Sequence, residues 1–121
     1  MRAHRLAMSL IALVLVSACG AAVTPASPTP TATTGASVTY QGFKATPLTL
    51  EIAKGTTVTW TNKDNTTHTI TSGTNRQPDG KFDSGDTAQN ETFSFTFKDA
   101  GTFEYFCSKH TSMVGFQIVV R

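Results

Sequence analysis

The sequence predicts an all-β domain, a sandwich of two packed sheets with seven or eight strands. Threonine is the commonest residue, with 22 in the chain of 121, and β-branched side chains favour pleated surfaces. Apolar and polar residues alternate over several short segments, and no segment of useful length has helical periodicity. The 85 residues from Ser37 onward can form only a modest core, which two packed sheets bury more easily than one.

The first expected strands lie on either side of a turn at Gly55. Segment 48–52 alternates leucine or isoleucine with polar residues, which puts its apolar side chains on one face. Segment 57–61 alternates threonine with valine and tryptophan in the same way. A loop is predicted at 62–65, followed by a short strand at 67–71.

The second half begins with a less regular stretch and ends in three strands. Segment 72–91 is rich in glycine, aspartate and asparagine, which favour turns. We therefore expect mostly irregular structure there, with a short helical turn or an edge strand near Phe82. Alternating phenylalanines predict a strand over 93–97, and further strands are expected over 103–107 and, to close the domain, over 114–120.

The beginning of the chain has the composition of an export signal. Two arginines and a histidine precede an apolar run of 13 residues at 6–18, which is too short for an ordinary transmembrane helix. The run ends in Leu-Val-Ser-Ala-Cys at 15–19. This resembles a bacterial lipobox, in which the preceding peptide is removed and the cysteine is lipidated. We therefore expect a signal peptide at 1–18 and a lipid on Cys19, which would anchor the protein to the extracytoplasmic face of a bacterial membrane, periplasmic or cell-surface. The alternative is a plain signal peptide with a chance cysteine.

The residues after Cys19 are expected to separate this anchor from the domain. Residues 20–36 contain three of the five prolines and no charged residue, which predicts an extended linker. The chain then divides into a signal peptide at 1–18, a lipidated cysteine with a linker at 19–36, and a domain at 37–121. Without the signal peptide, eight basic residues balance eight acidic ones, so the composition offers no basic surface for nucleic acid.

Four residues of the exported chain have the chemistry of a copper site. Cys107, His110 and Met113 lie within seven residues at the end of an expected strand, and His68 starts another. Thiolate and thioether are soft ligands, imidazole suits copper, and two histidines with one cysteine and a weak axial methionine form blue-copper electron-transfer sites. Zinc sites use cysteine, histidine and carboxylate but not methionine. Each residue alone has an ordinary structural explanation, such as a buried thiol or a core methionine. Together they are the domain's only cysteine, only methionine and both histidines.

The segment Phe-Glu-Tyr-Phe-Cys-Ser-Lys-His at 103–110, followed by Met113, resembles the plastocyanin/amicyanin group of cupredoxins. Segments 58–62 and 67–69 add to a resemblance that covers the whole expected domain. The short Cys-x2-His-x2-Met spacing is most similar to that of amicyanin. The resemblance implies a Greek-key cupredoxin sandwich that binds one copper ion through His68, Cys107, His110 and Met113.

The resemblance also implies roles for residues beside the ligands. In the family the second histidine is exposed within an apolar patch and serves as the electron port, which implies this role for His110. The aromatic residue before the cysteine lies on a second surface route, which corresponds to Phe106, a phenylalanine where the family has tyrosine. Plant plastocyanins follow the first histidine with asparagine, whereas this chain has Thr69. Our hypothesis is that Thr69 and Ser108 together tie the two ligand segments to each other.

These observations predict a membrane-tethered, monomeric one-electron carrier that cycles between Cu(I) and Cu(II). It would dock transiently near His110 with a redox donor and acceptor, and weak electrostatics are expected because the sequence has no acidic run. The alternative is an extracytoplasmic protein that delivers or buffers Cu(I), although such a protein is expected to carry additional exposed methionine or histidine. An enzyme is disfavoured because a second copper centre needs further histidines, and a Cys-His hydrolase needs oxyanion machinery that the sequence does not indicate.

Overall fold

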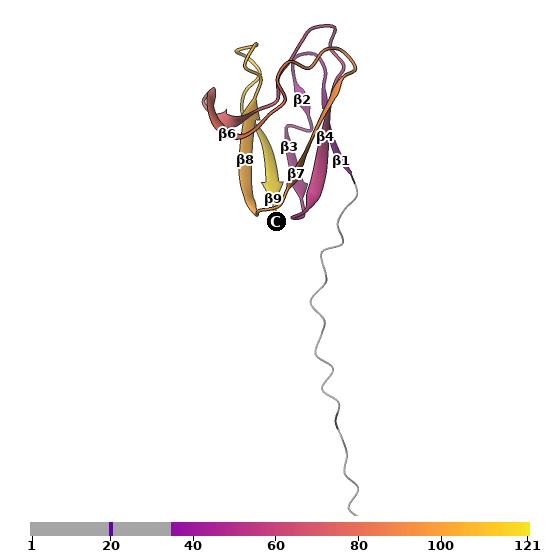
Figure 1. Cartoon of the computed structure of the whole chain (residues 1–121), viewed down its shortest axis with the longest axis vertical. Coiled ribbons are helices and arrows are strands. Elements are labelled where there is room, and N and C mark those ends of the chain that lie inside the picture. The colour runs from indigo at the N-terminus through magenta and orange to yellow at the C-terminus, as the bar shows by residue number, and fades with distance from the viewer. Residues whose placement is uncertain (1–19, 21–34) are drawn as a thin grey trace, which may run out of the picture.

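The computed structural model describes residue 20 and residues 35–121, and within these residues the regular structure consists of nine β-strands (Figure 1). The expected signal peptide, the lipidation site at Cys19 and nearly all of the linker lie outside the described residues. In the described part of the chain, no helix is long and apolar enough to span a membrane. The strands are β1 (Ala36–Tyr40), β2 (Ala45–Thr46), β3 (Thr49–Ile52), β4 (Thr56–Asn62), β5 (Thr71–Thr74), β6 (Gln77–Asp83), β7 (Thr92–Phe97), β8 (Gly101–Phe106) and β9 (Phe116–Val120).

The strands form two mixed sheets, ordered β2-β1-β4-β7 and β3-β9-β8-β5-β6. The pairs β1·β4 and β3·β9 are parallel, and the other neighbours are antiparallel. The chain passes from one sheet to the other after β2, β3, β4, β6 and β7. The predicted all-β sandwich is therefore confirmed. The strand count exceeds the expected seven or eight because β1 and β2 lie where no strand was predicted. The two residues of β2 are too few to give an alternation signal.

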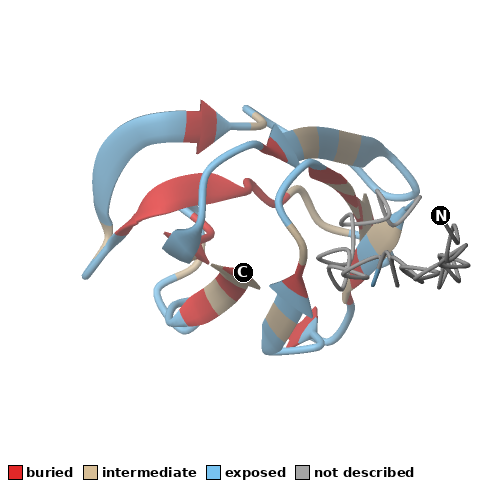
Figure 2. Ribbon diagram, turned by 90° about the horizontal axis from the view of Figure 1, so that it is seen from below, coloured by how far each residue is buried: buried red, intermediate tan, exposed pale blue. Residues whose placement is uncertain are grey.

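Alternation along the central strands builds the core between the sheets. In β4 every second residue is buried, and β9 follows the same pattern (Figure 2). Trp60 of β4 is fully buried at the centre of this core. Its ring lies within 6.3 Å, centroid to centroid, of four other aromatic rings, and each such pair contributes about 0.5–1.5 kcal/mol beyond the burial of area. These partners are Phe82, Phe93, Phe97 and Tyr105.

The segment from 67 to 91 differs from the prediction in two places. Residues 72–91 were expected to be mostly irregular, but the paired strands β5 and β6 lie over 71–83. The strand expected over 67–71 is absent there: His68 forms an isolated bridge with Thr87, and β5 begins only at Thr71. The reason is that the Thr69 N–H donates to the sulfur of Cys107 instead of to a neighbouring strand. The edge strand expected near Phe82 is confirmed as β6.

Two strand starts also differ from the alternation pattern. Leu48 is 59% exposed, because β3 begins one residue later. The last strand begins at Phe116 and not at 114, because the backbone of Met113 is bonded to the ligand loop through Cys107 and His110. The alternation of apolar and polar residues cannot predict where the last strand starts, because these bonds are made to residues outside the strand.

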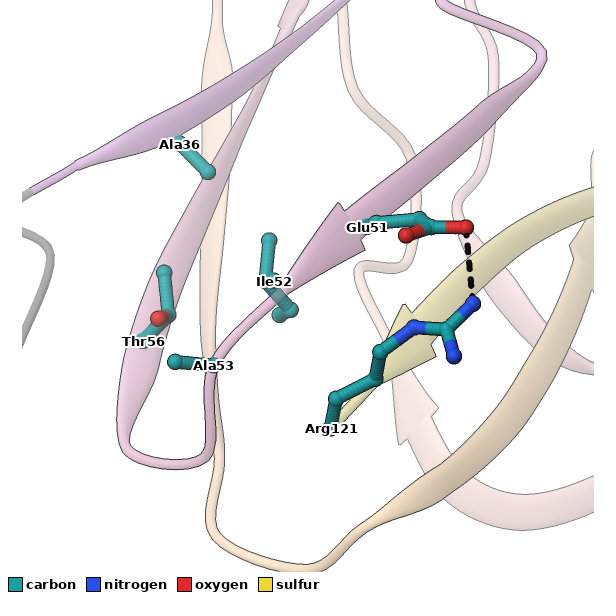
Figure 3. Close-up of a pocket in the computed structure, with 6 residues that line it drawn as sticks. All are labelled: Ala36, Glu51, Ile52, Ala53, Thr56 and Arg121. Carbon is teal, nitrogen blue, oxygen red and sulfur yellow. Dashed lines mark hydrogen bonds and ion pairs between the residues drawn. The ribbon is translucent and has the colours of Figure 1, made fainter. Parts of the chain in front are cut away.

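The loop after Cys107 lies at one end of the sandwich, and the start of β1 and the C-terminus lie at the other. Strands β1, β4 and β8 end, and β9 begins, at the end where the loop after Cys107 lies, drawn at the top of Figure 1. At the opposite end lie the start of β1 and the C-terminus, beside a hollow whose rim carries an exposed ion pair of 3.0 Å between Glu51 and Arg121 (Figure 3). The hollow is lined by Ala36, Glu51, Ile52, Ala53, Thr56 and Arg121.

Candidate metal centre

Three of the predicted ligand residues converge at the loop end of the sandwich. The ligand atoms of His68, Cys107 and His110 all lie within 4.8 Å of one another. The Cys107 sulfur lies 3.7 Å from Nδ1 of His68 and 3.5 Å from Nδ1 of His110, and the two Nδ1 atoms lie 3.1 Å apart. One sulfur and two imidazole nitrogens therefore face a common point.

The fourth predicted residue, Met113, belongs to the same loop. Cys107 follows directly on β8, and its N–H donates to the Met113 carbonyl over 2.9 Å. The Met113 N–H in turn donates to the His110 carbonyl over 3.1 Å. Met113 is fully buried. These two bonds close the loop so that all three of its predicted ligand residues remain together.

His68 is held from behind by a carboxylate. Its side chain is fully buried, and its Nε2 lies 2.9 Å from Oδ2 of Asp64. Since Nε2 is engaged by this contact, Nδ1 is the atom presented to Cys107 and His110, as expected for a carboxylate that orients a ligating imidazole. Burial raises the pKa of Asp64, but hydrogen bonds from the Phe43 and Gly42 N–H groups and from His68 outweigh it, so the pKa lies below its usual value.

Asp64 also holds the turn that covers the site. Its two oxygens accept the N–H groups of Gly42 and Phe43 over 2.7 and 3.0 Å. Phe43 adopts a left-handed backbone conformation with φ of 60°, which is uncommon for a bulky residue. Its ring lies edge-on to both imidazoles, 5.5 Å from His68 and 5.0 Å from His110 between centroids. A half-exposed aromatic ring thus caps the two histidines.

Sequence reasoning missed both Asp64 and Phe43. For Asp64 a signal was available, namely an acidic residue four positions before the first histidine in the expected loop. Phe43 gave no signal, because a single aromatic residue after a glycine is common in exposed turns. Their contacts across 21 and 22 positions depend on the pairing of β1 with β4.

Thr69 and Ser108 lie in direct contact between the two ligand segments. Oγ1 of Thr69 accepts the Ser108 N–H over 2.8 Å and lies 3.0 Å from the Ser108 hydroxyl. The Thr69 N–H donates to the Cys107 sulfur over 3.3 Å. The pair that the sequence hypothesis assigned to tying these segments is therefore placed between His68 and the Cys107–His110 loop.

The two residues predicted as electron ports differ in exposure. His110 is half-buried. Phe106, by contrast, is only 3% exposed, and the guanidinium carbon of Arg76 lies 5.8 Å from the centre of its ring. A cation thus lies over the Phe106 ring. Sequence reasoning did not single out Arg76.

The donor set fits copper. It combines a thiol sulfur with two imidazoles, and the adjoining Met113 offers a thioether, which is the soft combination that copper prefers. Within the described residues, the cluster includes no carboxylate, because Asp64 contacts the far nitrogen of His68. Fold and donor set together define a copper-binding β-sandwich.

The comparisons with known proteins agree. The family model of copper binding proteins, plastocyanin/azurin family, matches residues 32–121, and the chain belongs to this family. A novel purple cupredoxin from Nitrosopumilus maritimus is 33% identical, with a TM-score of 0.64, over 71% of this chain and 99% of that one. A reduced amicyanin mutant and a Cu(I) form of another amicyanin mutant are each 25% identical, with TM-scores of 0.63, over 72% of this chain and 82% of theirs. The cupredoxin resemblance and the copper cofactor predicted from the sequence are thereby confirmed.

Proposed function

We propose that the domain is a one-electron carrier whose site residues are His68, Cys107, His110 and Met113. The observation that carries the proposal is the convergence of one thiol and two imidazoles on a single point. The Cys107 sulfur is held by the Thr69 N–H, the His68 imidazole by Asp64, and the backbone carbonyl of His110 by Arg76. Bound copper would supply a one-electron Cu(I)/Cu(II) couple at this point. The chain supplies a donor set whose positions are fixed by backbone and side-chain hydrogen bonds, which keeps the structural change on electron transfer small.

The surface around the site supports transient docking of a redox partner near His110. Among the described residues, the exposed large hydrophobic side chains are Phe43, Leu48 and Val114. Phe43 contacts both histidines, Val114 follows Met113, and the Leu48 carbonyl accepts a hydrogen bond from Gln117 where β9 begins. All three therefore belong to the loop end. An apolar surface at the port fits a weak, weakly salt-dependent encounter of a monomeric carrier with its donor and acceptor.

We include in the proposal an extracytoplasmic location and a lipid anchor at Cys19. Strand β1, the first of the domain, starts at the end of the sandwich opposite the ligand loop (Figure 1). A tether entering there would leave the docking surface free. Acyl labelling with membrane fractionation tests this part: Cys19→Ser should abolish the label and release the protein, and retention of the protein in the membrane would refute the anchor.

The proposal assigns no enzymatic activity to the domain. A second copper centre needs further histidines. The three histidines of the chain are His4, in the expected signal peptide, and the two that already belong to the cluster. The same shortage argues against the alternative of Cu(I) delivery, for which additional exposed soft ligands are expected.

The test is the colour and redox behaviour of the purified protein loaded with Cu(II). An electron carrier should show an intense visible thiolate absorption and reversible one-electron reduction, and Cys107→Ser should lose the band while the sandwich remains folded. A colourless protein that binds only Cu(I) would instead support delivery or buffering. Survival of the band in Cys107→Ser would show that the ligand set is wrong.

A further inference from the structure

Arg76 lies at the tip of the hairpin that joins β5 to β6. Thr74 pairs with Gln77, so the turn consists of Asn75 and Arg76 alone. Both have left-handed backbones, with φ of 52° and 62°, as a two-residue turn of this kind requires. Asparagine accepts this conformation readily, but an arginine adopts it rarely. Turn chemistry therefore gives no reason for an arginine at this position.

The hairpin also approaches itself closely before the tip. A Cβ added to Gly73 would overlap the carbonyl oxygen of Gln77, and the φ of Gly73 is 144°. Only glycine fits this contact. The backbone of the hairpin is thus fixed tightly, and the direction in which Arg76 leaves the turn is fixed with it.

Within the described residues, every hydrogen bond of the Arg76 guanidinium goes to the ligand loop. Its Nη1 donates to the carbonyls of Cys107 and His110 over 3.2 and 3.1 Å, and its Nη2 donates to the carbonyl of Ser108 over 2.9 Å. Three carbonyls from four consecutive residues are therefore turned toward one planar cation. The fork of an arginine suits this task, whereas a lysine ammonium is a point charge that cannot reproduce it.

A second contact holds the guanidinium near an aromatic ring. Its carbon lies 5.8 Å from the centre of the Phe106 ring, and Phe106 is itself buried. The ring attracts the cation as a cation–π partner. Arg76 is therefore held in place by a buried residue that directly precedes Cys107.

We propose that Arg76 is a positioning residue that clamps the Cys107–His110 turn in the conformation that presents both ligand atoms. It reaches no ligand atom itself, and it acts through the carbonyls of the two ligand residues and of Ser108. The clamp is a property of the chain's own hydrogen bonds. Its value for electron transfer rests on the proposed function, since a fixed loop keeps Cys107 and His110 in place during the redox change.

The loop carries a second cation that serves as a matched control. Lys109 lies between Ser108 and His110 and pairs over 2.9 Å with Asp86, with side chains 39% and 68% exposed. Removing its charge changes the electrostatics of the loop but removes none of the three carbonyl bonds. Arg76→Lys keeps the charge at the hairpin and removes the fork, so the two variants separate charge from clamping.

The test is amide hydrogen exchange in the metal-free full chain. The probes are the N–H groups of Cys107 and Met113, which are bonded within the loop. Arg76→Gln and Arg76→Lys should raise their exchange about ten- to hundredfold, because each charge-assisted bond is strong and a tenfold change corresponds to a single bond of this kind. Lys109→Gln should leave both rates unchanged, and strand β9 should keep its protection in all variants.

Each outcome decides the proposal. Unchanged exchange in Arg76→Gln would overturn it, and wild-type exchange in Arg76→Lys would show that charge alone suffices. If Arg76→Gln folds poorly, Arg76→Gly removes the guanidinium while accommodating the left-handed turn, and the same comparison applies. Loss of copper to a chelator should then be faster in the Arg76 variants than in Lys109→Gln. A chain that never shows reversible reduction would refute the proposed function and leave the exchange result intact.

Discussion

The two histidines of the site are held in opposite ways. His68 is fully buried and fixed through its own side chain, by a carboxylate that also holds the Phe43 turn. His110 is half-buried, and it is its backbone carbonyl that is held, by Arg76 and by the Met113 N–H. His68 is thus anchored at its imidazole. His110 is anchored at its main chain, and its imidazole reaches the surface. A site of this kind combines a rigid interior with an accessible edge, which is what an electron carrier needs.

The largest expected difference between His68 and His110 is the response of the copper site to removal of each imidazole. In His110→Gly, added imidazole should enter the half-open position and restore the visible absorption of the copper-loaded protein. In His68→Gly it should not, because that position is buried behind Phe43 and faces Asp64. The free energy of unfolding should also fall by roughly 2–5 kcal/mol in His68→Gly, and this loss should exceed the loss in His110→Gly. Equal rescue of both variants would remove the contrast.

The next largest effect is expected at Asp64, which contacts the His68 imidazole and holds the Phe43 turn. Asp64→Ala should lower the free energy of unfolding of the metal-free protein by about 1–3 kcal/mol, because three donors lose their acceptor. The control is Asp86→Ala, which removes an exposed carboxylate beside the other histidine and should cost less than about 1 kcal/mol. Urea unfolding measures both, and similar costs would show that Asp64 is an ordinary surface residue.

Thr69 and Ser108 connect the His68 segment to the Cys107–His110 loop. A smaller effect is expected when this connection is weakened. Thr69→Val keeps the shape of the side chain but leaves the Ser108 N–H without its acceptor, at a cost of about 1–2 kcal/mol. The reduction potential or the retention of copper should change with it. Thr57→Val removes a threonine–threonine hydroxyl contact on an outer face and should alter neither. An unchanged copper site in Thr69→Val would refute the role given to Thr69 and Ser108.

The smallest effect concerns the pH dependence of the hairpin that carries Arg76. Burial raises the pKa of Asp79, but hydrogen bonds from Lys81 and Ser72 outweigh it and hold the pKa below its ordinary value of 3.8. The folded state therefore binds fewer protons than the unfolded state, so this contribution is present above pH 3.8 and is lost as the pH falls through the lowered pKa. Asp79→Asn should flatten the dependence of unfolding free energy on pH below about 4. An unaltered slope would contradict the assignment.

Most of the fold and the donor set could be predicted because both depend on local patterns. Alternation at period two located β4, β7 and β9, since the side chains of a strand point to opposite faces. The ligand types could be identified because thiol, imidazole and thioether are rare in this chain and fall into one order. The strand expected at 67–71 was wrong because the backbone there is bonded to Cys107, 38 positions away.

The sequence by itself determined an all-β sandwich and a soft donor set with one cysteine, two histidines and one methionine. Only the tertiary structure decided what holds these donors: Asp64 behind His68, Phe43 above both rings, and Arg76 across the ligand loop. The physical reason is that residue type and alternation are properties of short segments. Hydrogen bonds across 31 to 34 positions, such as those of Arg76, exist only once two sheets have paired and brought a hairpin tip to the loop.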